Sequence, residues 1–112
     1  MQDTVFISFQ NGLGNEELVA ELMGKDSVLG GLTAQGANIE GPGHIRAHTN
    51  LTTWIGEMDG KDSTRVKQLC KLFSDHGLPS EASMEIKKQI WCKLLYNLAV
   101  SPMSTLTDLS LR

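Results

Sequence analysis

The chain has 112 residues and a formal net charge of -3, with 10 lysines and arginines against 13 aspartates and glutamates. This acidic balance argues against binding to nucleic acid or to an anionic membrane, because both normally need a basic surface. No apolar run reaches transmembrane length and no basic-then-apolar secretion signal opens the chain, so a cytoplasmic protein is the default expectation.

The first segment predicts a strand followed by a helix. Val5 to Phe9 is a short, mostly apolar run rich in strand formers, which is typical of a buried parallel strand. The glycines of QNGLGN, residues 10–15, allow a tight turn after it. Asn15 is then expected to cap a helix that runs to about Met23 and stops at Gly24.

A second strand is expected from Ser27 to Gln35, where Gly30 and Gly31 indicate a bulge or a close backbone approach. The order is therefore β-α-β, which normally builds a parallel sheet covered by helices. Ligands of such sheets bind beyond the carboxyl ends of the strands. Gln10 and Asn11 are expected at that edge, so both are candidate binding residues.

Residues 40–62 carry different turn signals. The sequence EGPG at 40–43 predicts a turn, and two strand-like runs follow it, at about 44–49 and 51–57. Together these runs suggest a hairpin. The polar, glycine-punctuated segment 56–62 is the candidate domain boundary.

A helix is expected from Ser63, its N-cap, to about His76, with Gly77 as its C-terminal stop. Five apolar residues should form its buried side: Val66, Leu69, Cys70, Leu72 and Phe73. Residues 78–84 are expected to link this helix to the last one.

The segment 90–107 predicts one long amphipathic helix. Ile90, Leu94 and Leu98 recur every four residues, and Trp91 and Leu95 widen the same apolar stripe, which should pack into a core. Pro102 lacks a backbone donor, so the helix is expected to end or kink just past residue 101.

Lys93, Asn97 and Ser101 also step by four and form a polar row beside that stripe. A lysine next to an apolar wall can donate a proton or stabilise negative charge growing on an oxygen atom. An asparagine one turn further on can orient a polar substrate. The spacing alone leaves open the simpler interpretation that Lys93 only reaches into solvent.

Other motifs predict less. Residues 12–17, GLGNEE, have an acidic residue where a dinucleotide-binding G-x-G-x-x-G turn has its third glycine. His44 and His48 lack a carboxylate or thiolate cluster, so no metal site is expected. Cys70 and Cys92 lack a CxxC partner and are expected to be reduced, partly buried helix residues.

Five separated blocks, in one order, resemble the ketopantoate reductase (2-dehydropantoate 2-reductase) family. The blocks are QNGLGNEE at 10–17, VLGGLTAQGA at 28–37, PGHI at 42–45, IGEMDG at 55–60 and IWCKLLYNLAVSPMSTLT at 90–107. The resemblance covers nearly the full chain and corresponds to the middle portion of family members. Several collinear blocks are more specific than any single motif found here.

The resemblance implies an NADPH-dependent oxidoreductase that reduces 2-dehydropantoate, a 2-oxo acid, to pantoate. It also implies an α/β fold, in which the latter part of a Rossmann-like parallel-sheet domain is followed by the start of an all-helical C-terminal domain. On this basis residues 1–60 belong to the nucleotide-binding domain and residues 61–112 to the helical substrate and dimerisation domain.

The resemblance also assigns roles to individual residues. Lys93 falls on the family's catalytic lysine, which protonates or stabilises the forming alkoxide, and Asn97 falls on a substrate-binding asparagine. Asn11 falls on an asparagine near the nicotinamide and substrate, so Asn11 and the adjacent Gln10 are the expected NADP(H) contacts. Ser101 stands where the family often has a second substrate-binding asparagine, and it is kept as a candidate substrate contact.

The family's glycine-rich phosphate turn and its later substrate-binding serine and glutamate have no counterpart in these residues. The expectation is therefore a homo-oligomer or a part of a longer chain. Two alternatives to the reductase stay open: a truncated, non-catalytic interaction or oligomerisation fragment of the family, and a related dehydrogenase acting on other 2-hydroxy acids.

Overall fold

The computed structural model describes residues 4–108 as a mixed sheet with helices on both faces, a two-stranded arm and one long helix. In chain order the elements are β1 (Phe6–Ser8), α1 (Asn15–Met23), the 3-10 turn η1 (Lys25–Ser27), β2 (Val28–Thr33), β3 (Ala37–Gly41), β4 (His44–Ala47), β5 (Thr53–Glu57), α2 (Thr64–Asp75), β6 (Ser80–Ala82) and α3 (Ile86–Thr107). The expected α/β architecture is confirmed.

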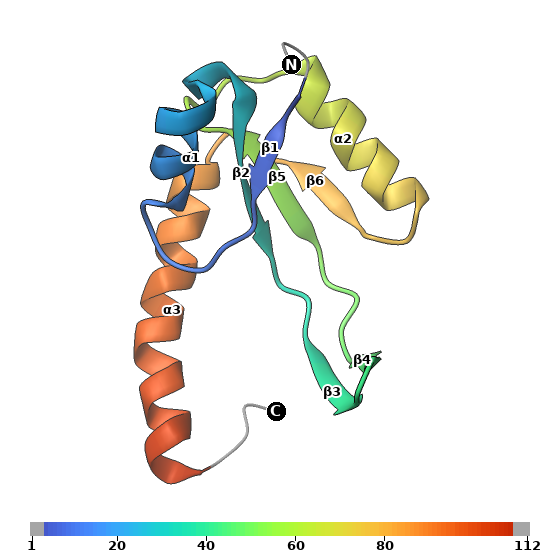
Figure 1. Ribbon diagram of the computed structural model, residues 1–112, viewed down its shortest axis with the longest axis vertical. Coiled ribbons are helices and arrows are strands. Elements are labelled where there is room, and N and C mark those ends of the chain that lie inside the picture. The colour runs from blue at the N-terminus through green and yellow to red at the C-terminus, as the bar shows by residue number, and fades with distance from the viewer. Residues whose placement is uncertain (1–3, 109–112) are drawn as a thin grey trace.

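The main sheet has the strand order β1-β2-β5-β6. β1 runs parallel to β2 and β5 runs parallel to β6, as the β-α-β pattern predicts for the first pair. β5 is antiparallel to β2, so the sheet is mixed and not purely parallel. α3 lies along one side of the sheet and α2 along the other (Figure 1).

Two groups of buried side chains hold these layers together. On the α2 side the buried residues are Leu29, Ile55, Val66 and Cys70. On the α3 side they are Leu32, Ile86 and Ile90, with Trp54 and Met58 packed against them. The alternation of side chains along β2 and β5 supplies both groups, because successive strand residues point to opposite faces.

The predicted hairpin between residues 44–49 and 51–57 is wrong. β4 pairs with β3 around the turn at 42–43, and β5 instead pairs with β2. The burial of the strands gives the reason: β5 is largely buried and fits the middle of the sheet, whereas every residue of β4 is exposed. The β3–β4 arm therefore projects beyond the sheet (Figure 1).

Local signals around the first turn are partly confirmed. The N-cap of α1 is Gly14, with φ of 88°, and not Asn15, whose side chain instead donates to the Asn11 carbonyl oxygen at 3.3 Å. Gly31 provides the expected close approach, because a Cβ there would lie 2.5 Å from Phe9 Cε1. The pairing of β2 with β5 has no bulge at this position.

α2 follows its prediction closely. The Ser63 hydroxyl accepts a hydrogen bond from the Val66 amide, and Gly77 adopts φ of 90° just past the helix end. Leu72 is exposed, so that part of the expected buried side is wrong. The expected link at 78–84 contains β6, a three-residue strand that no residue pattern marks.

α3 differs most from expectation. It begins at Ile86 and continues through Pro102 to Thr107, so the predicted end past Ser101 is wrong. The expected apolar stripe is confirmed at Ile90, which is buried, and is wrong at three other members, which are exposed: Trp91, Leu95 and Leu98. Cys92, expected to be partly buried, is exposed, whereas Cys70 is buried as predicted; both are free.

None of the helices in residues 4–108 is long and apolar enough to cross a membrane.

Candidate functional site

Lys93 occupies a half-buried position at the carboxyl end of β2. Its ammonium nitrogen donates to the Thr33 carbonyl oxygen at 2.9 Å, across sixty residues of sequence. Desolvation by the surrounding residues lowers the pKa of Lys93 from its ordinary 10.5. The amine is thus held at a defined place and is easier to deprotonate than a lysine in free solution.

The face of α3 that carries Lys93 explains this position. Ile86, Ile90, Lys93 and Asn97 are spaced by four, three and four residues, the spacing of one helix face. Ile86 and Ile90 are buried against the sheet. Lys93 and Asn97 continue the face of Ile86 and Ile90 toward the C-terminus of α3. The polar row was predicted to lie beside the buried side of the helix, and in the structure it extends that buried side.

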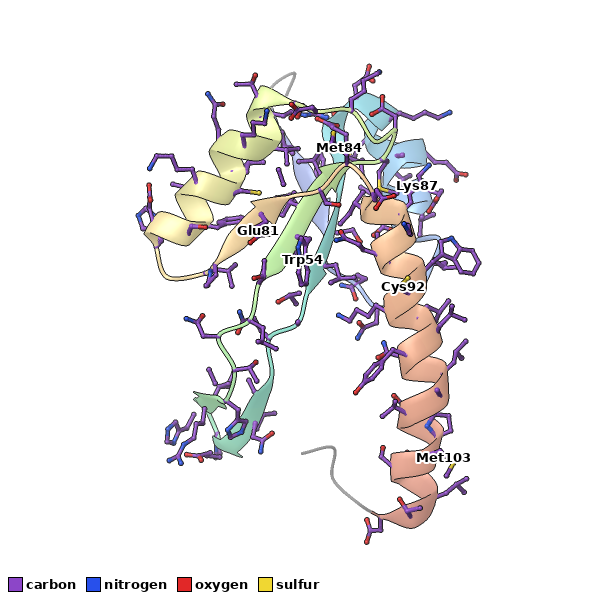
Figure 2. All side chains as sticks on the ribbon, turned by 180° about the vertical axis from the view of Figure 1, so that it is seen from behind. Trp54, Glu81, Met84, Lys87, Cys92 and Met103 are labelled. Carbon is purple, nitrogen blue, oxygen red and sulfur yellow. The ribbon has the colours of Figure 1, made fainter. Side chains whose placement is uncertain are left out.

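A shallow hollow of about 380 Å³ adjoins Lys93. Its lining residues are Leu32, Trp54, Glu85, Lys88, Gln89 and Cys92. Trp54 projects from β5 and Cys92 from α3 in Figure 2. Although three of these residues are polar or charged, most of the surface that the wall exposes to the hollow is apolar, which is the setting that desolvates an amine.

Asn97 and Ser101 line a second open hollow, further along α3, of about 620 Å³. Asn97 is half-buried and Ser101 is exposed. Among the described residues no hydrogen bond joins either side chain to Lys93. The structure thus brings Lys93 to the sheet edge and puts Asn97 on the same helix face, with Ser101 one turn further out.

Gln10 and Asn11 lie in the exposed turn that follows β1. Because β1 is parallel to β2 with Ser8 opposite Gly30, the turn after β1 leaves the sheet at the same edge as Thr33. The two amide side chains could therefore approach a ligand at the edge where Lys93 is anchored. The described residues offer no hydrogen bond between this turn and Lys93.

The same turn offers an incomplete cradle for a dinucleotide. Gly12 and Gly14 both have positive φ, near 90°, and α1 begins directly after them. Glu16 and Glu17 then occupy the first turn of the helix, where an anionic pyrophosphate would be repelled. Glu16 and Glu17 therefore do not fit the phosphates of such a cofactor, whereas the side chains of Gln10 and Asn11 are of the type that could hydrogen-bond the carboxamide of a nicotinamide.

Within residues 4–108, no group of three or more histidine, cysteine or acidic side chains is arranged to hold a metal ion.

Thr33 and Thr53 are residues of this site that the sequence did not single out. Thr33 provides the acceptor for Lys93, and the Thr53 hydroxyl donates to the Thr33 hydroxyl at 3.0 Å. The one available signal was the polar residue at the end of an otherwise apolar strand, VLGGLT.

Comparisons with known proteins agree on one group. The model of the family described as ketopantoate reductase PanE/ApbA matches residues 1–60. A 2-dehydropantoate 2-reductase of Archaeoglobus fulgidus is 38% identical over 102 residues, which cover 91% of this chain and 34% of the relative.

The crystal structure of 2-dehydropantoate 2-reductase from Geobacter metallireducens superposes with a TM-score of 0.88 at 28% identity, covering 96% of this chain and 36% of that one. A D-mandelate dehydrogenase structure with NADH has a TM-score of 0.86 at 23% identity, a likeness of fold alone, covering 96% of this chain and 36% of that one. The chain spans about a third of the length of the relatives it matches.

Proposed function

Since the chain belongs to the ketopantoate reductase family, we propose that it carries the proton-donating part of the active site of an NADPH-dependent oxidoreductase, which reduces 2-dehydropantoate to pantoate. The observation that carries the proposal is the Lys93 ammonium, half-buried at the carboxyl end of β2 and bonded to the Thr33 carbonyl oxygen. Ligands of α/β sheets bind at this edge.

The proposed reaction adds two hydrogens across the ketone of a 2-oxo acid. NADPH, when bound, supplies the hydride that the ketone carbon receives. The Lys93 ammonium donates its proton to the ketone oxygen as negative charge develops there, and solvent then reprotonates the amine. Its lowered pKa supports this role, because an acid works best when its pKa lies closer to the working pH.

The remaining candidates are assigned to binding. Asn97 lies on the helix face of Lys93 and would hydrogen-bond the substrate, with Ser101 as a second contact one turn further on. Asn11 would contact both the substrate and the nicotinamide, and Gln10 the nicotinamide alone, from the turn that leaves the same sheet edge.

The proposal includes the setting of the chain. Residues 1–60 would belong to a nucleotide-binding domain and residues 61–112 to the start of a helical domain, in a cytoplasmic protein that is a homo-oligomer or part of a longer chain.

A second candidate function is that of a non-catalytic fragment that binds partner chains. The observation that favours it is the set of exposed apolar residues on α3, which are Trp91, Leu95, Leu98, Met103 and Leu106.

A graft tests the proposal. The 102 residues of the Archaeoglobus fulgidus relative that align with this chain are replaced by this chain's residues, and NADPH oxidation is followed with 2-dehydropantoate. The expected result is turnover within about a hundredfold of the parent enzyme, with binding of NADPH retained. A folded graft that binds NADPH but reduces no 2-oxo acid contradicts the proposal.

Substrate and cofactor are separated in the same assay. A panel of branched and aromatic 2-oxo acids, each with NADPH and with NADH, distinguishes a reductase of 2-dehydropantoate from a related 2-hydroxy-acid dehydrogenase. Turnover that is highest with 2-dehydropantoate and NADPH supports the specific proposal. Preference for an aromatic 2-oxo acid favours the related dehydrogenase.

A further inference from the structure

The acceptor that holds Lys93 is itself held by a pair of threonine hydroxyls. Thr33 and Thr53 are direct partners at the end of the β2–β5 pairing. The Thr53 hydroxyl donates to the Thr33 hydroxyl at 3.0 Å, and Thr53 is fully buried. A buried hydroxyl with a defined partner has little freedom to rearrange.

The Thr33 hydroxyl accepts a second hydrogen bond, from the Gln35 backbone N–H at 3.2 Å. This bond from residue i+2 to a threonine hydroxyl closes a small turn just as β2 ends. The two bonds together fix the Thr33 side chain and the direction of the backbone that follows it. The Thr33 carbonyl group, which accepts from Lys93, is part of that same backbone unit.

The two threonine side chains act from the face of the sheet opposite α3. Along β2, Leu29 and Thr33 share a face by alternation, and Leu29 packs in the group of buried residues that includes α2. The buried partner of the pair, Thr53, also has its amide bonded to the Pro79 carbonyl oxygen at 2.8 Å. Neither hydroxyl therefore needs to touch a ligand to influence the amine.

We propose that Thr53 is a positioning residue for Lys93: through the Thr33 hydroxyl it fixes the carbonyl oxygen that anchors the lysine ammonium. The inference rests on the proposed function only for its effect on turnover. Its structural part, the hold on the amine, is measurable without any substrate.

The environment of Lys93 makes a titration informative. The ionisable side chains around the adjoining hollow are Glu85, the N-cap of α3, and Lys88 and Cys92 on α3, whereas β2 and β5 contribute Leu32 and Trp54. Within residues 4–108, no charged side chain of the sheet pairs with Lys93 there. If the Thr33 carbonyl is no longer fixed, the long lysine side chain is free to move into water, and its pKa rises toward the ordinary value of 10.5.

The first experiment follows the Lys93 side chain by NMR in the chain labelled with ¹³C-lysine, with Lys93→Arg used to assign the signal. In Thr53→Val the Lys93 titration midpoint is expected to rise, and in Thr53→Ser, which keeps the hydroxyl, it is expected to stay at the wild-type value. Thr33→Val tests the same hydroxyl pair from its half-buried member and should raise the midpoint as well. An unchanged or lowered midpoint in the two valine variants overturns the proposal.

Thr49→Val is the matched control. The Thr49 hydroxyl accepts from the Gly36 backbone amide at 2.6 Å and donates to the Ala34 carbonyl oxygen at 3.4 Å. Its loss therefore loosens the segment just beyond β2 but leaves the Thr33–Thr53 hydroxyl pair in place. Lys93 should titrate as in the wild type in this variant. A rise equal to that of Thr53→Val would mean that general loosening moves the amine, which contradicts a specific role for Thr53.

The second experiment measures turnover in the graft described above. Thr53→Val should lower kcat by about two- to tenfold, the effect of one hydrogen bond, with KM little changed and with activity restored in Thr53→Ser. If Thr53→Val raises the titration midpoint of Lys93 but does not lower kcat, Thr53 does position the amine. That result contradicts the proposed role of Lys93 as the acid. An unchanged midpoint contradicts the role of Thr53 whatever the turnover.

Discussion

The two halves of α3 have similar residues and opposite surroundings. In the first half, Ile86 and Ile90 are 1% and 7% exposed against the sheet. In the second half, Leu98 and Leu106 are 61% and 81% exposed, and Figure 2 shows Met103 near the free end of the helix. Lys93 lies where the packed half ends. The comparison shows that apolar spacing predicts a helix well but does not say which turns of it will meet a partner.

Truncating one apolar residue in each half tests the comparison most strongly. Ile86→Ala removes a buried side chain and should lower the free energy of unfolding by about 2–5 kcal/mol. Leu98→Ala removes an exposed one and should change it by less than about 0.5 kcal/mol. Urea denaturation of both variants measures the difference. Equal losses would mean that the second half of α3 is packed in solution, as in an oligomer.

A glycine pair sharpens the same contrast between packed and open regions. A Cβ at Gly56 would overlap the Ser83 carbonyl oxygen and approach Ile86, whereas a Cβ at Gly41 in the arm would meet nothing within 4 Å. Gly56→Ala should therefore destabilise the chain by about 1–3 kcal/mol, the usual cost of overpacking. Gly41→Ala should leave the midpoint of urea denaturation nearly unchanged. A tolerated Gly56→Ala would contradict the close packing of β5 against the start of α3.

The ion pair between β5 and α2 is expected to have a smaller, pH-dependent effect. Arg65 donates from Nε and Nη2 to the two carboxylate oxygens of Glu57, each at 2.6 Å. These hydrogen bonds are the main reason that the pKa of Glu57 is lowered from 4.5. A carboxylate whose pKa is lower in the folded state than in the unfolded state stabilises the fold at pH values above its unfolded pKa. The stabilisation by the Glu57–Arg65 pair is therefore fully present above pH 4.5 and is lost as the pH falls through the lowered pKa of Glu57.

Arg65→Met should thus lower the free energy of unfolding by about 1–2 kcal/mol near neutral pH. The expected loss is kept small because the arginine side chain is 36% exposed and water screens its charge. The difference from the wild type should shrink as the pH is lowered below 4.5. Urea denaturation at a series of pH values measures it. A difference that is constant with pH would show that Arg65 acts through packing or through its hydrogen bond to the Asp26 carbonyl oxygen, and not through its pairing with Glu57.

Local chemistry decided which parts of the fold were predictable. The turn after β1, the Ser63 cap and the glycine stops of α1 and α2 all depend on residues near one another in sequence, and the structure agrees with them. The partner of β5 and the existence of β6 depend on pairings across the sheet. Spacing carries no information about such pairings, so the predicted hairpin was wrong.

The candidate site divides in the same way. Spacing was enough to put Lys93 and Asn97 on neighbouring turns of one helix. The contact that fixes the amine, with Thr33, joins residues sixty positions apart, and the Thr33–Thr53 hydroxyl pair joins two strands whose pairing was not predicted. The roles of Lys93, Asn97, Ser101, Asn11 and Gln10 in a reaction stay predictions.

The most direct test of the account is the turnover of the graft with Lys93→Ala, compared with Lys71→Ala as control. Lys71 lies on the outer side of α2, paired with Asp75 at 2.6 Å, and shares only its charge with Lys93. Lys93→Ala is predicted to lower kcat by about 10²- to 10⁴-fold, the usual contribution of a positioned acid, with the graft still folded and still binding NADPH. Turnover that stays within about twofold of the unsubstituted graft in both variants would contradict the assignment of Lys93 as the proton donor.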